Sequence, residues 1–308
     1  MSRSPIVSVV IPAYNHGHFL KETLDSVVAQ TFTDWEAIVV NNFSEDDTIS
    51  IVESFADPRI RLENFRNNGI IGASRNRGVA LARGKYVAFL DSDDAWYPEK
   101  LARCMEHFKS GAELVCHGLR RFGEQERDLI FGPEKRATFE ALLFDGNCLG
   151  ASAVVVLKEK LELVAGVSEK PSLVTAEDYH LWIKLAKAGV KMRFIKEMLG
   201  RHRFYSGSQS GAVLRHMNAE LSVLEDFLPP EGSRSLVVRM RARRRRCLAY
   251  YGAGRAMHRK GQFAEARSLL FRAVASWPFY FKAYVAILLG VFAGVFPKND
   301  ASLPKAAF

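Results

Sequence analysis

Residues 86–96, YVAFLDSDDAW, place three aspartates directly behind an apolar run. The run YVAFL shows no alternation of polar and apolar residues, which is typical of a strand covered on both faces. Asp91, Asp93 and Asp94 follow its carboxyl end, and open α/β sheets bind ligands outside the carboxyl ends of their strands. The stretch therefore predicts a buried parallel strand that delivers three carboxylates to a ligand site.

The segments around this stretch alternate between strand and helix. Strand-like runs are followed by apolar residues at helical spacing, and Pro98 falls in the first turn of the next predicted helix. This order predicts an α/β, Rossmann-like fold with a largely parallel central sheet and helices on both faces. The predicted strands are PIVSVVIPAY (5–14), WEAIVV (35–40), RIRLENF (59–65) and KYVAFL (85–90), and the helices are 18–30, 46–56, 72–84 and 98–110.

From about residue 111 the pattern becomes less regular. AELVCHG (112–118), ASAVVVL (151–157) and VKMRFI (190–195) indicate strands, and AEDYHLWIKLAKAG (176–189) indicates a helix. LGRHRFYSGSQSG (199–211) is polar and rich in glycine, which favours a loop or linker. We therefore predict one catalytic domain over residues 1–210 and a second, helical region over 211–308.

The C-terminal region has two further patterns. Residues 247–280 match one tetratricopeptide-like helical hairpin, at Tyr250, Gly254, Gly261, Phe263, Ala266, Ala273 and Pro278. Residues 283–296 are fourteen apolar residues, AYVAILLGVFAGVF. A helix of that length reaches about 21 Å, short of the roughly 30 Å of a hydrocarbon core.

The distribution of charge and the spacing of the cysteines indicate where in the cell the protein acts. Residues 1–210 have a net charge of −1, whereas residues 211–308 have a net charge of +10. A basic tail on a neutral domain favours an anionic partner, here a membrane surface. The four cysteines form no C-x-x-C pair, which indicates reduced thiols in the cytoplasm. We predict a cytoplasmic protein bound peripherally to the inner face of the plasma membrane.

Two explanations fit the aspartates at 91–94. Clustered carboxylates suit a hard divalent cation, Mg²⁺ or Mn²⁺, which in turn neutralises a diphosphate. Alternatively, Asp93 and Asp94 cap the helix that begins near Pro98. Capping needs one side chain and not three, and Asp94 fits the capping role best.

Three other motifs are open to two interpretations each. Asn41 and Asn42 follow a strand, where they would contact a nucleotide or form an ordinary turn. Asp178 stands three residues after Thr175, as a general base or as part of a capping box. Arg75 and Arg77, in the glycine-containing segment 67–84, would contact a phosphate or face solvent.

Three ordered stretches together resemble the family 2 glycosyltransferases, inverting enzymes of the GT-A fold. They are VSVVIPAYNHGHFLKETLDSVVAQTFTDWEAIVV (7–40), GASRNRGVALARGKYVAFLDSDDAWYPEKL (72–101) and AEDYHLWIKLAKAG (176–189). The resemblance extends over about residues 5–210 and implies the nucleotide-diphospho-sugar transferase fold. It implies transfer of a sugar from a nucleotide-sugar donor, with a UDP-sugar as first choice, to a hydroxyl of a glycan or glycolipid acceptor.

The resemblance also implies roles for individual residues. Pro12 and Tyr14 match the nucleotide-binding turn, with Tyr14 stacking on the base, and Asn42 stands where the family has a base-contacting aspartate. Asp91 and Asp93 match the D-x-D motif. Asp93 would hold the metal, and Asp91 would assist it near the ribose and sugar of the donor. Asp178 matches the catalytic base, and Arg75 remains a candidate donor-binding residue.

Two positions depart from the family pattern. Asn41-Asn42 replaces an aspartate pair, and Tyr205 stands where a histidine is usual in LGRHRFYSGSQS. The function predicted is glycosyl transfer in cell-surface polysaccharide or lipopolysaccharide biosynthesis.

Three other functions are less well supported. A catalytically degenerate scaffold is an alternative, as is a sugar nucleotidyltransferase. The latter lacks a basic loop, since PAYNHGHF (12–19) has no Lys or Arg. RMRARRRR (239–246) lacks interleaved aromatic residues, so no nucleic-acid partner is predicted.

Overall fold

The computed structural model describes residues 4–124, 126–205 and 212–295. The chain divides into two compact units. Unit 1 comprises Met1–Ala212 with Glu225–Phe227, and unit 2 comprises Val213–Leu224 with Leu228–Phe308. Each unit has its own hydrophobic core and is treated separately below.

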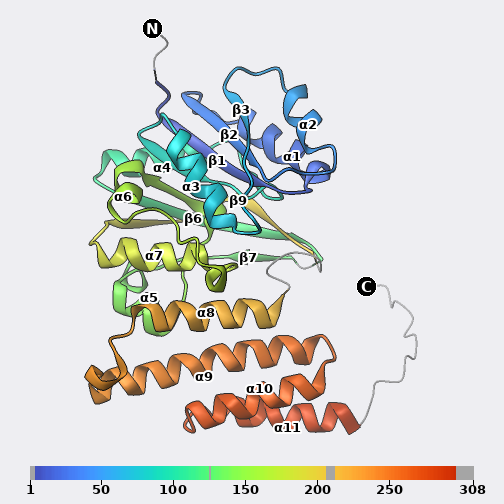
Figure 1. Ribbon diagram of the computed structural model, residues 1–308, viewed down its shortest axis with the longest axis vertical. Coiled ribbons are helices and arrows are strands. Elements are labelled where there is room, and N and C mark those ends of the chain that lie inside the picture. The colour runs from blue at the N-terminus through green and yellow to red at the C-terminus, as the bar shows by residue number, and fades with distance from the viewer. Residues whose placement is uncertain (1–3, 125, 206–211, 296–308) are drawn as a thin grey trace, which may run out of the picture. The chain divides into compact units, whose positions relative to one another are not determined.

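Unit 1 is built on one sheet of nine strands, in the order β3-β2-β1-β4-β8-β6-β9-β5, with β7 paired to β6 (Figure 1). Strands β1 to β4 run parallel to one another, as predicted, and β8 pairs antiparallel with both β4 and β6, so the complete sheet is mixed. The strands are β1 (Val7–Ala13), β2 (Trp35–Asn41), β3 (Ile60–Asn64), β4 (Tyr86–Phe89), β5 (Ala95–Trp96), β6 (Leu114–Gly123), β7 (Arg127–Leu129), β8 (Val154–Leu157) and β9 (Met192–Phe204).

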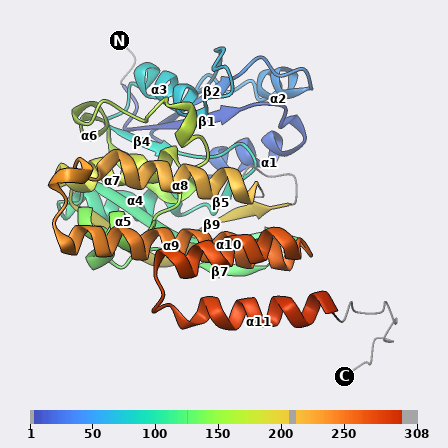
Figure 2. The same ribbon diagram turned by 60° about the horizontal axis from the view of Figure 1, so that its bottom comes forward.

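Helices accompany the strands of unit 1 as the apolar spacing predicts (Figures 1 and 2). Close packing explains the glycines of the third helix: a Cβ on Gly78 would lie 2.3 Å from Val10 Cγ1, and one on Gly72 would lie 2.5 Å from the Ser168 carbonyl oxygen. These two glycines allow the close approach of a neighbouring side chain and of a neighbouring backbone segment. The helices are α1 (Gly17–Val28), α2 (Thr48–Ser54), α3 (Ile71–Leu81), α4 (Lys100–Lys109), α5 (Phe139–Asp145), α6 (Lys158–Leu163) and α7 (Glu177–Lys187), with short 3₁₀ turns at Glu134–Arg136, Ala151–Ala153 and Pro171–Leu173.

The loop predicted for residues 199–211 is wrong over its first half. β9 continues to Phe204 and pairs in parallel with β6 and antiparallel with β5. Backbone pairing on both sides offsets the weak strand propensity of its Gly and Arg residues. The remainder, 206–211, lies outside the described residues, so that part of the prediction is not examined. The extension brings Arg201, His202 and Arg203 next to the loop of residues 91–94, which we call the aspartate loop.

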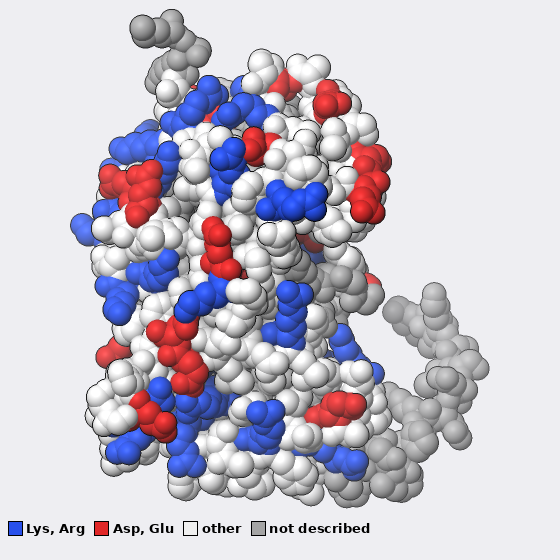
Figure 3. All heavy atoms as spheres, in the orientation of Figure 1, with Lys and Arg blue, Asp and Glu red and all other residues white. Residues whose placement is uncertain are grey.

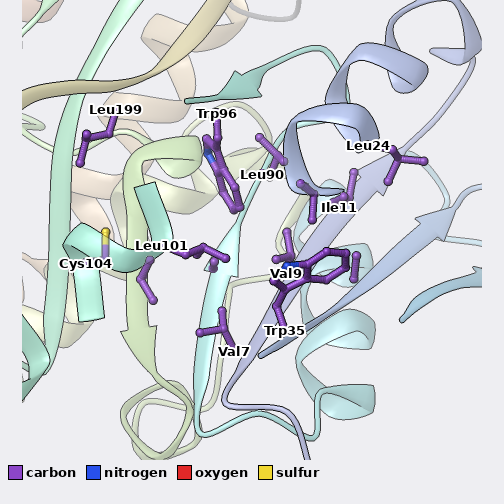
Figure 4. Close-up of a cluster of buried hydrophobic side chains, with 14 of the residues drawn as sticks. Val7, Val9, Ile11, Leu24, Trp35, Leu90, Trp96, Leu101, Cys104 and Leu199 are labelled. Carbon is purple, nitrogen blue, oxygen red and sulfur yellow. The ribbon is translucent and has the colours of Figure 1, made fainter. Parts of the chain in front are cut away.

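Figure 4 shows part of the core of unit 1, where Trp35 lies among the β1 residues Val9 and Ile11 and Leu24 of α1. These side chains are almost completely buried, as a strand covered on both faces requires. One member of this interior is basic: Lys100, at the start of α4, is fully buried. Its Nζ lies 3.4 Å from the centroid of the Trp96 ring and has no hydrogen-bond partner among the described residues.

Unit 2 is helical. α9 and α10 form a hairpin around the segment predicted to be tetratricopeptide-like, and α11 packs on α10 (Figure 2). Gly254 allows the close crossing, because a Cβ there would lie 2.9 Å from Leu270 Cγ. Within the described residues, every helix is too short or too polar to cross a membrane. The helices are α8 (Val213–Phe227, shared with unit 1), α9 (Leu236–Arg259), α10 (Phe263–Ser276) and α11 (Phe281–Val295), with a 3₁₀ turn at Glu231–Ser233. Residue 296, the last of the predicted apolar segment, lies outside the described residues.

The buried amine leads to a stability prediction. Burial lowers the pKa of Lys100 from 10.5 to about 7. Between those values the unfolded chain binds more protons, so the wild-type free energy of unfolding should rise as pH increases from 7 to 10. Lys100→Met should raise that free energy at pH 7 by on the order of 2–4 kcal/mol, with a smaller gain near pH 10. Urea denaturation at both pH values measures this, and a less stable variant at pH 7 would contradict it.

Candidate active site

Three parallel strands end at the same edge of the sheet. Ala13 pairs with Asn41 across β1 and β2, and Val10 pairs with Phe89 across β1 and β4. The residues that follow these strands therefore meet, as the sequence predicts for a doubly covered sheet. Pro12 is buried within β1, and Tyr14 follows β1 with half of its surface exposed. Asn42 and Asp91 follow the neighbouring strands β2 and β4 at this edge.

The asparagines at the end of β2, Asn41 and Asn42, hold neighbouring loops by hydrogen bonds. Asn41 is fully buried, and its Oδ1 accepts hydrogen bonds from Ser44 N at 3.0 Å and Ser44 Oγ at 2.6 Å. Asn42 Oδ1 accepts from Asn67 N at 2.9 Å, which ties down the loop before α3. The turn interpretation therefore accounts for Asn41. Asn42 lies at the edge where a nucleotide would be contacted.

The environment of Asp93 disfavours the charged form of its carboxyl group. Burial, followed by the charges of Asp94 and Asp91, raises its pKa to about 8. No other described residue donates a hydrogen bond to its side chain, whereas its neighbours are both partnered. No group of three or more His, Cys, Asp or Glu side chains forms a ready-made metal cage in the described part of the chain. A positive charge placed beside Asp93 would therefore favour the ionised form of its carboxyl group.

The helix-capping explanation is wrong for the aspartates. α4 has Glu99 at its N-cap and no side-chain cap. Asp94, only 2% exposed, instead accepts a hydrogen bond from Arg203 N at 2.8 Å and contacts His202 Nδ1 at 3.2 Å. Both partners come from the part of β9 that was expected to be a loop. Asp94 therefore fastens the aspartate loop to β9.

Arg75 joins the two acidic motifs. Its side chain is 5% exposed, and its Nη2 donates to Asp91 Oδ1 at 2.8 Å while its Nη1 donates to Glu177 Oε1. Burial by itself would lower the pKa of the guanidinium. The carboxylates of Asp91, Glu177 and Asp178 outweigh this effect, so the pKa is raised above its ordinary value. Arg77, by contrast, pairs with Glu63 at the surface. Residues 75, 91, 177 and 178 thus form one charged cluster from distant parts of the chain.

Asp178 lies in the first turn of α7. The capping box is not formed, because the N-cap is Ala176 without a side-chain cap, and it is Glu177 Oε2 that accepts from Thr175 N at 2.8 Å. Asp178 Oδ1 accepts from Tyr179 N at 2.6 Å. Burial and the neighbouring Glu177 raise its pKa to about 6, while Arg75 limits the rise. A carboxylate with such a pKa is ionised at neutral pH and is still basic enough to accept a proton.

A histidine that sequence reasoning missed lies beside the aspartate loop. His16 Nδ1 is 2.8 Å from Ser92 Oγ, and its Nε2 is 3.3 Å from the Tyr205 hydroxyl. Burial and His18 lower the pKa of His16, so the imidazole is neutral at neutral pH. Burial and the charge of Asp93 raise the pKa of Tyr205. Tyr205, which stands where the family has histidine, is thus paired with an imidazole from another strand end.

No sequence signal could have identified these partners. His16 belongs to no periodic pattern, and His202 and Arg203 were placed in a predicted loop. Their positions depend on pairing of β9 with β6 and β5, which local sequence does not reveal.

Comparison with known proteins identifies the family. The family model described as Glycosyl transferase family 2 matches residues 8–146. The chain is 30% identical over 216 residues to the putative teichuronic acid biosynthesis glycosyltransferase TuaG of Bacillus subtilis, which covers 67% of this chain and 82% of that protein. It is 29% identical over 230 residues to the Escherichia coli UDP-Glc:alpha-D-GlcNAc-diphosphoundecaprenol beta-1,3-glucosyltransferase WfgD, covering 72% and 87%.

Solved structures share the fold at lower identity. S. aureus TarS in complex with UDP-GlcNAc aligns with a TM-score of 0.58 at 17% identity, covering 92% of this chain and 89% of that one. The Pyrobaculum calidifontis mannosyltransferase PcManGT, in complex with GDP-Man and Mn²⁺, aligns with a TM-score of 0.59 at 17% identity, covering 96% and 82%. The predicted GT-A-type fold is confirmed.

The link between Asp94 and His202 leads to a pH-dependent prediction. Burial alone would lower the pKa of His202, but Asp94 outweighs it, and the pKa is raised above 6.5. The ion pair then stabilises the fold below pH 6.5, and that contribution is lost as pH rises through the raised value. Asp94→Asn should therefore reduce the free energy of unfolding by about 1.5–3 kcal/mol near pH 6 and by less near pH 9.

Denaturation at the two pH values, with a surface variant such as Asp128→Asn as control, measures the difference. A loss that grows with pH would disprove the ion-pair role of His202.

Proposed function

The chain belongs to glycosyl transferase family 2 and is a glycosyltransferase of the GT-A fold, and we propose that it transfers a sugar from a nucleotide-sugar donor with inversion of configuration. A UDP-sugar is the first candidate for the donor. The acceptor is a hydroxyl of a glycan or glycolipid, in cell-surface polysaccharide or lipopolysaccharide biosynthesis. The relatives TuaG and WfgD, named for teichuronic acid synthesis and for a UDP-Glc reaction, support this proposal.

The observation that carries the proposal is the bridge made by Arg75. It holds Asp91, at the end of β4, and the Glu177-Asp178 pair, at the start of α7, on one guanidinium. The donor side of the site and the proposed base are therefore fixed relative to each other by a buried group. Holding reacting groups in place lowers the entropic barrier to transfer.

Asp178 is the proposed catalytic base. Its carboxylate would accept the proton of the acceptor hydroxyl, whose oxygen attacks the anomeric carbon as the bond to the nucleoside diphosphate breaks. Attack from the face opposite the leaving group inverts the configuration. Arg75 keeps Asp178 sufficiently ionised at neutral pH, while burial keeps it basic.

The aspartate loop fits a divalent cation, Mg²⁺ or Mn²⁺. Asp93 is the proposed ligand, because its carboxylate is crowded by two like charges and has no donor from another described residue. Asp91 is proposed as a second ligand. One of its carboxylate oxygens, Oδ1, accepts a hydrogen bond from Arg75. When bound, the cation supplies charge neutralisation for the diphosphate. The complex of PcManGT with GDP-Man and Mn²⁺ supports this assignment.

The remaining donor contacts are proposed from their place at the sheet edge. Tyr14 would stack on the base, with Pro12 and Asn42 shaping the same turn. The His16–Tyr205 pair, next to Ser92, is proposed to donate a hydrogen bond from the phenol to a diphosphate oxygen, which the contacts of His16 with Ser92 and Tyr205 support. The basic region 211–308 is proposed to contact an anionic membrane surface at the cytoplasmic side.

The role of Asp178 is tested by Asp178→Asn. Transfer should fall by at least about 10³-fold, because the amide cannot accept the proton. The melting temperature should be unchanged or slightly higher, because the raised pKa means that ionisation of Asp178 costs folding free energy above pH 6. In the wild type, kcat should decrease as pH falls through about 6. Transfer that survives in folded Asp178→Asn would exclude this residue as the base.

Metal-dependent donor binding is tested by thermal shift. A panel of nucleoside diphosphates and nucleotide sugars is measured with and without Mn²⁺. One nucleotide should stabilise the wild type only when Mn²⁺ is present, whereas Asp93→Asn should lose most of that metal-dependent shift. Asp128→Asn, a surface aspartate, serves as the control and should behave as wild type. If no nucleotide stabilises the wild type, the scaffold alternative is supported and the proposed donor site is wrong.

A further inference from the structure

α11 packs in an unusual orientation. Ala283 and Ala286 are buried on its inner side, at 0% and 1% exposure. The large apolar side chains point outward instead, between 40% and 78% exposed. These exposed side chains are Phe281, Tyr284, Val285, Leu288 and Leu289. Their spacing of three and four residues places them on one side of the helix, over an arc of about 140°.

The turn before the helix extends this surface. Phe279 is 72% exposed and lies two residues before Phe281. We call these six residues, 279, 281, 284, 285, 288 and 289, the α11 face. Small residues inward and large residues outward reverse the pattern of a helix in a soluble protein. Contiguous exposed apolar surface of this kind marks a site of interaction.

The segment that contains α9, α10 and the described side chains of α11 is strongly basic. Residues 236–289 contain twelve Lys and Arg residues and a single acidic residue, Glu265. Arg243 donates to the carbonyl oxygens of Ala275 and Ser276, which places its guanidinium at the end of α10 next to the turn that carries Phe279. Lys282 is exposed beside Phe281. Figure 3 shows Lys and Arg, together with a few Asp and Glu, on the visible face of unit 2.

Apolar and basic groups together identify the partner. A second copy of the chain would bring two such positive surfaces together, which repel each other. Nucleic acid would satisfy the arginines but would leave the aliphatic side chains in water. The interface of an anionic bilayer satisfies both, with apolar side chains at the acyl boundary and basic groups at the headgroups.

We infer that the α11 face inserts into the interface of an anionic bilayer, with the helix lying in the plane of the membrane and Arg243 and Lys282 contacting lipid phosphates. This inference rests on the proposed function, in which the basic C-terminal region contacts an anionic membrane, and it names the residues that make the contact.

Vesicle sedimentation of the full-length protein tests the inference. The probes are vesicles of phosphatidylcholine with and without phosphatidylglycerol. The wild type should bind the anionic vesicles. Leu288→Ser/Leu289→Ser should weaken binding by more than about tenfold, because two buried leucines are lost from the interface. Ile130→Ser, which removes an equally exposed aliphatic side chain from unit 1, should bind as the wild type does.

The basic contribution is measured separately. Arg243→Gln and Lys282→Gln should each reduce the preference for anionic vesicles by about fivefold, and added salt should abolish the difference. Circular dichroism melting confirms that each variant is folded, as expected for exposed positions.

Two results would overturn the inference. One is a wild type that does not bind anionic vesicles, and the other is equal binding by Leu288→Ser/Leu289→Ser. If the wild type instead forms a dimer that this variant loses in sedimentation velocity, a second copy covers the α11 face. The proposed function fails separately: Asp178→Asn should bind vesicles normally without transferring sugar, and the α11 variants should retain transfer to a soluble acceptor.

Discussion

A buried guanidinium holds the candidate active site together. Arg75 is almost inaccessible to water, and such a charge is tolerated in a protein interior only when paired and hydrogen-bonded. Asp91, 16 positions after Arg75, and Glu177, 102 positions after it, provide that pairing. The same contacts set the charge state of Asp178, whose pKa reflects burial and Glu177 against the attraction of Arg75. Packing, electrostatics and the proposed catalysis therefore depend on one residue.

The aspartate loop shows how neighbouring residues of one type acquire different roles. Asp94 is buried and partnered by His202 and by the backbone of Arg203, so it positions the loop. Asp91 is held by Arg75. Asp93 lacks a comparable partner, and burial together with the charges of Asp94 and Asp91 raises its pKa. A cation bound beside it would lower that pKa again and favour the ionised form that binds metal. Of the three carboxylates, Asp93 is therefore the one whose charge is not balanced by a hydrogen-bonded partner among the described residues.

α11 packs differently from the rest of the protein. Unit 1 buries its large apolar residues against the sheet, and α8 to α10 of unit 2 also bury large apolar side chains. In unit 2, α11 buries alanines and exposes large apolar side chains among basic residues. The first arrangement excludes water from a site for chemistry. The second leaves an apolar surface, for which we propose lipid contact.

The sequence alone was sufficient for the α/β class, the parallel strands β1 to β4, the C-terminal helices and the placement of Tyr14, Asn42 and Asp91 at one sheet edge. These follow from hydrophobic periodicity and from strand ends, which are local properties. Tertiary structure decided the rest. It turned residues 199–204 into a strand, because pairing on both sides outweighs local propensity, and it removed the capping roles expected for Asp94 and Asp178. It also brought His16 to Tyr205 and Arg75 to Glu177, contacts between residues about 100 or more positions apart that no local pattern encodes.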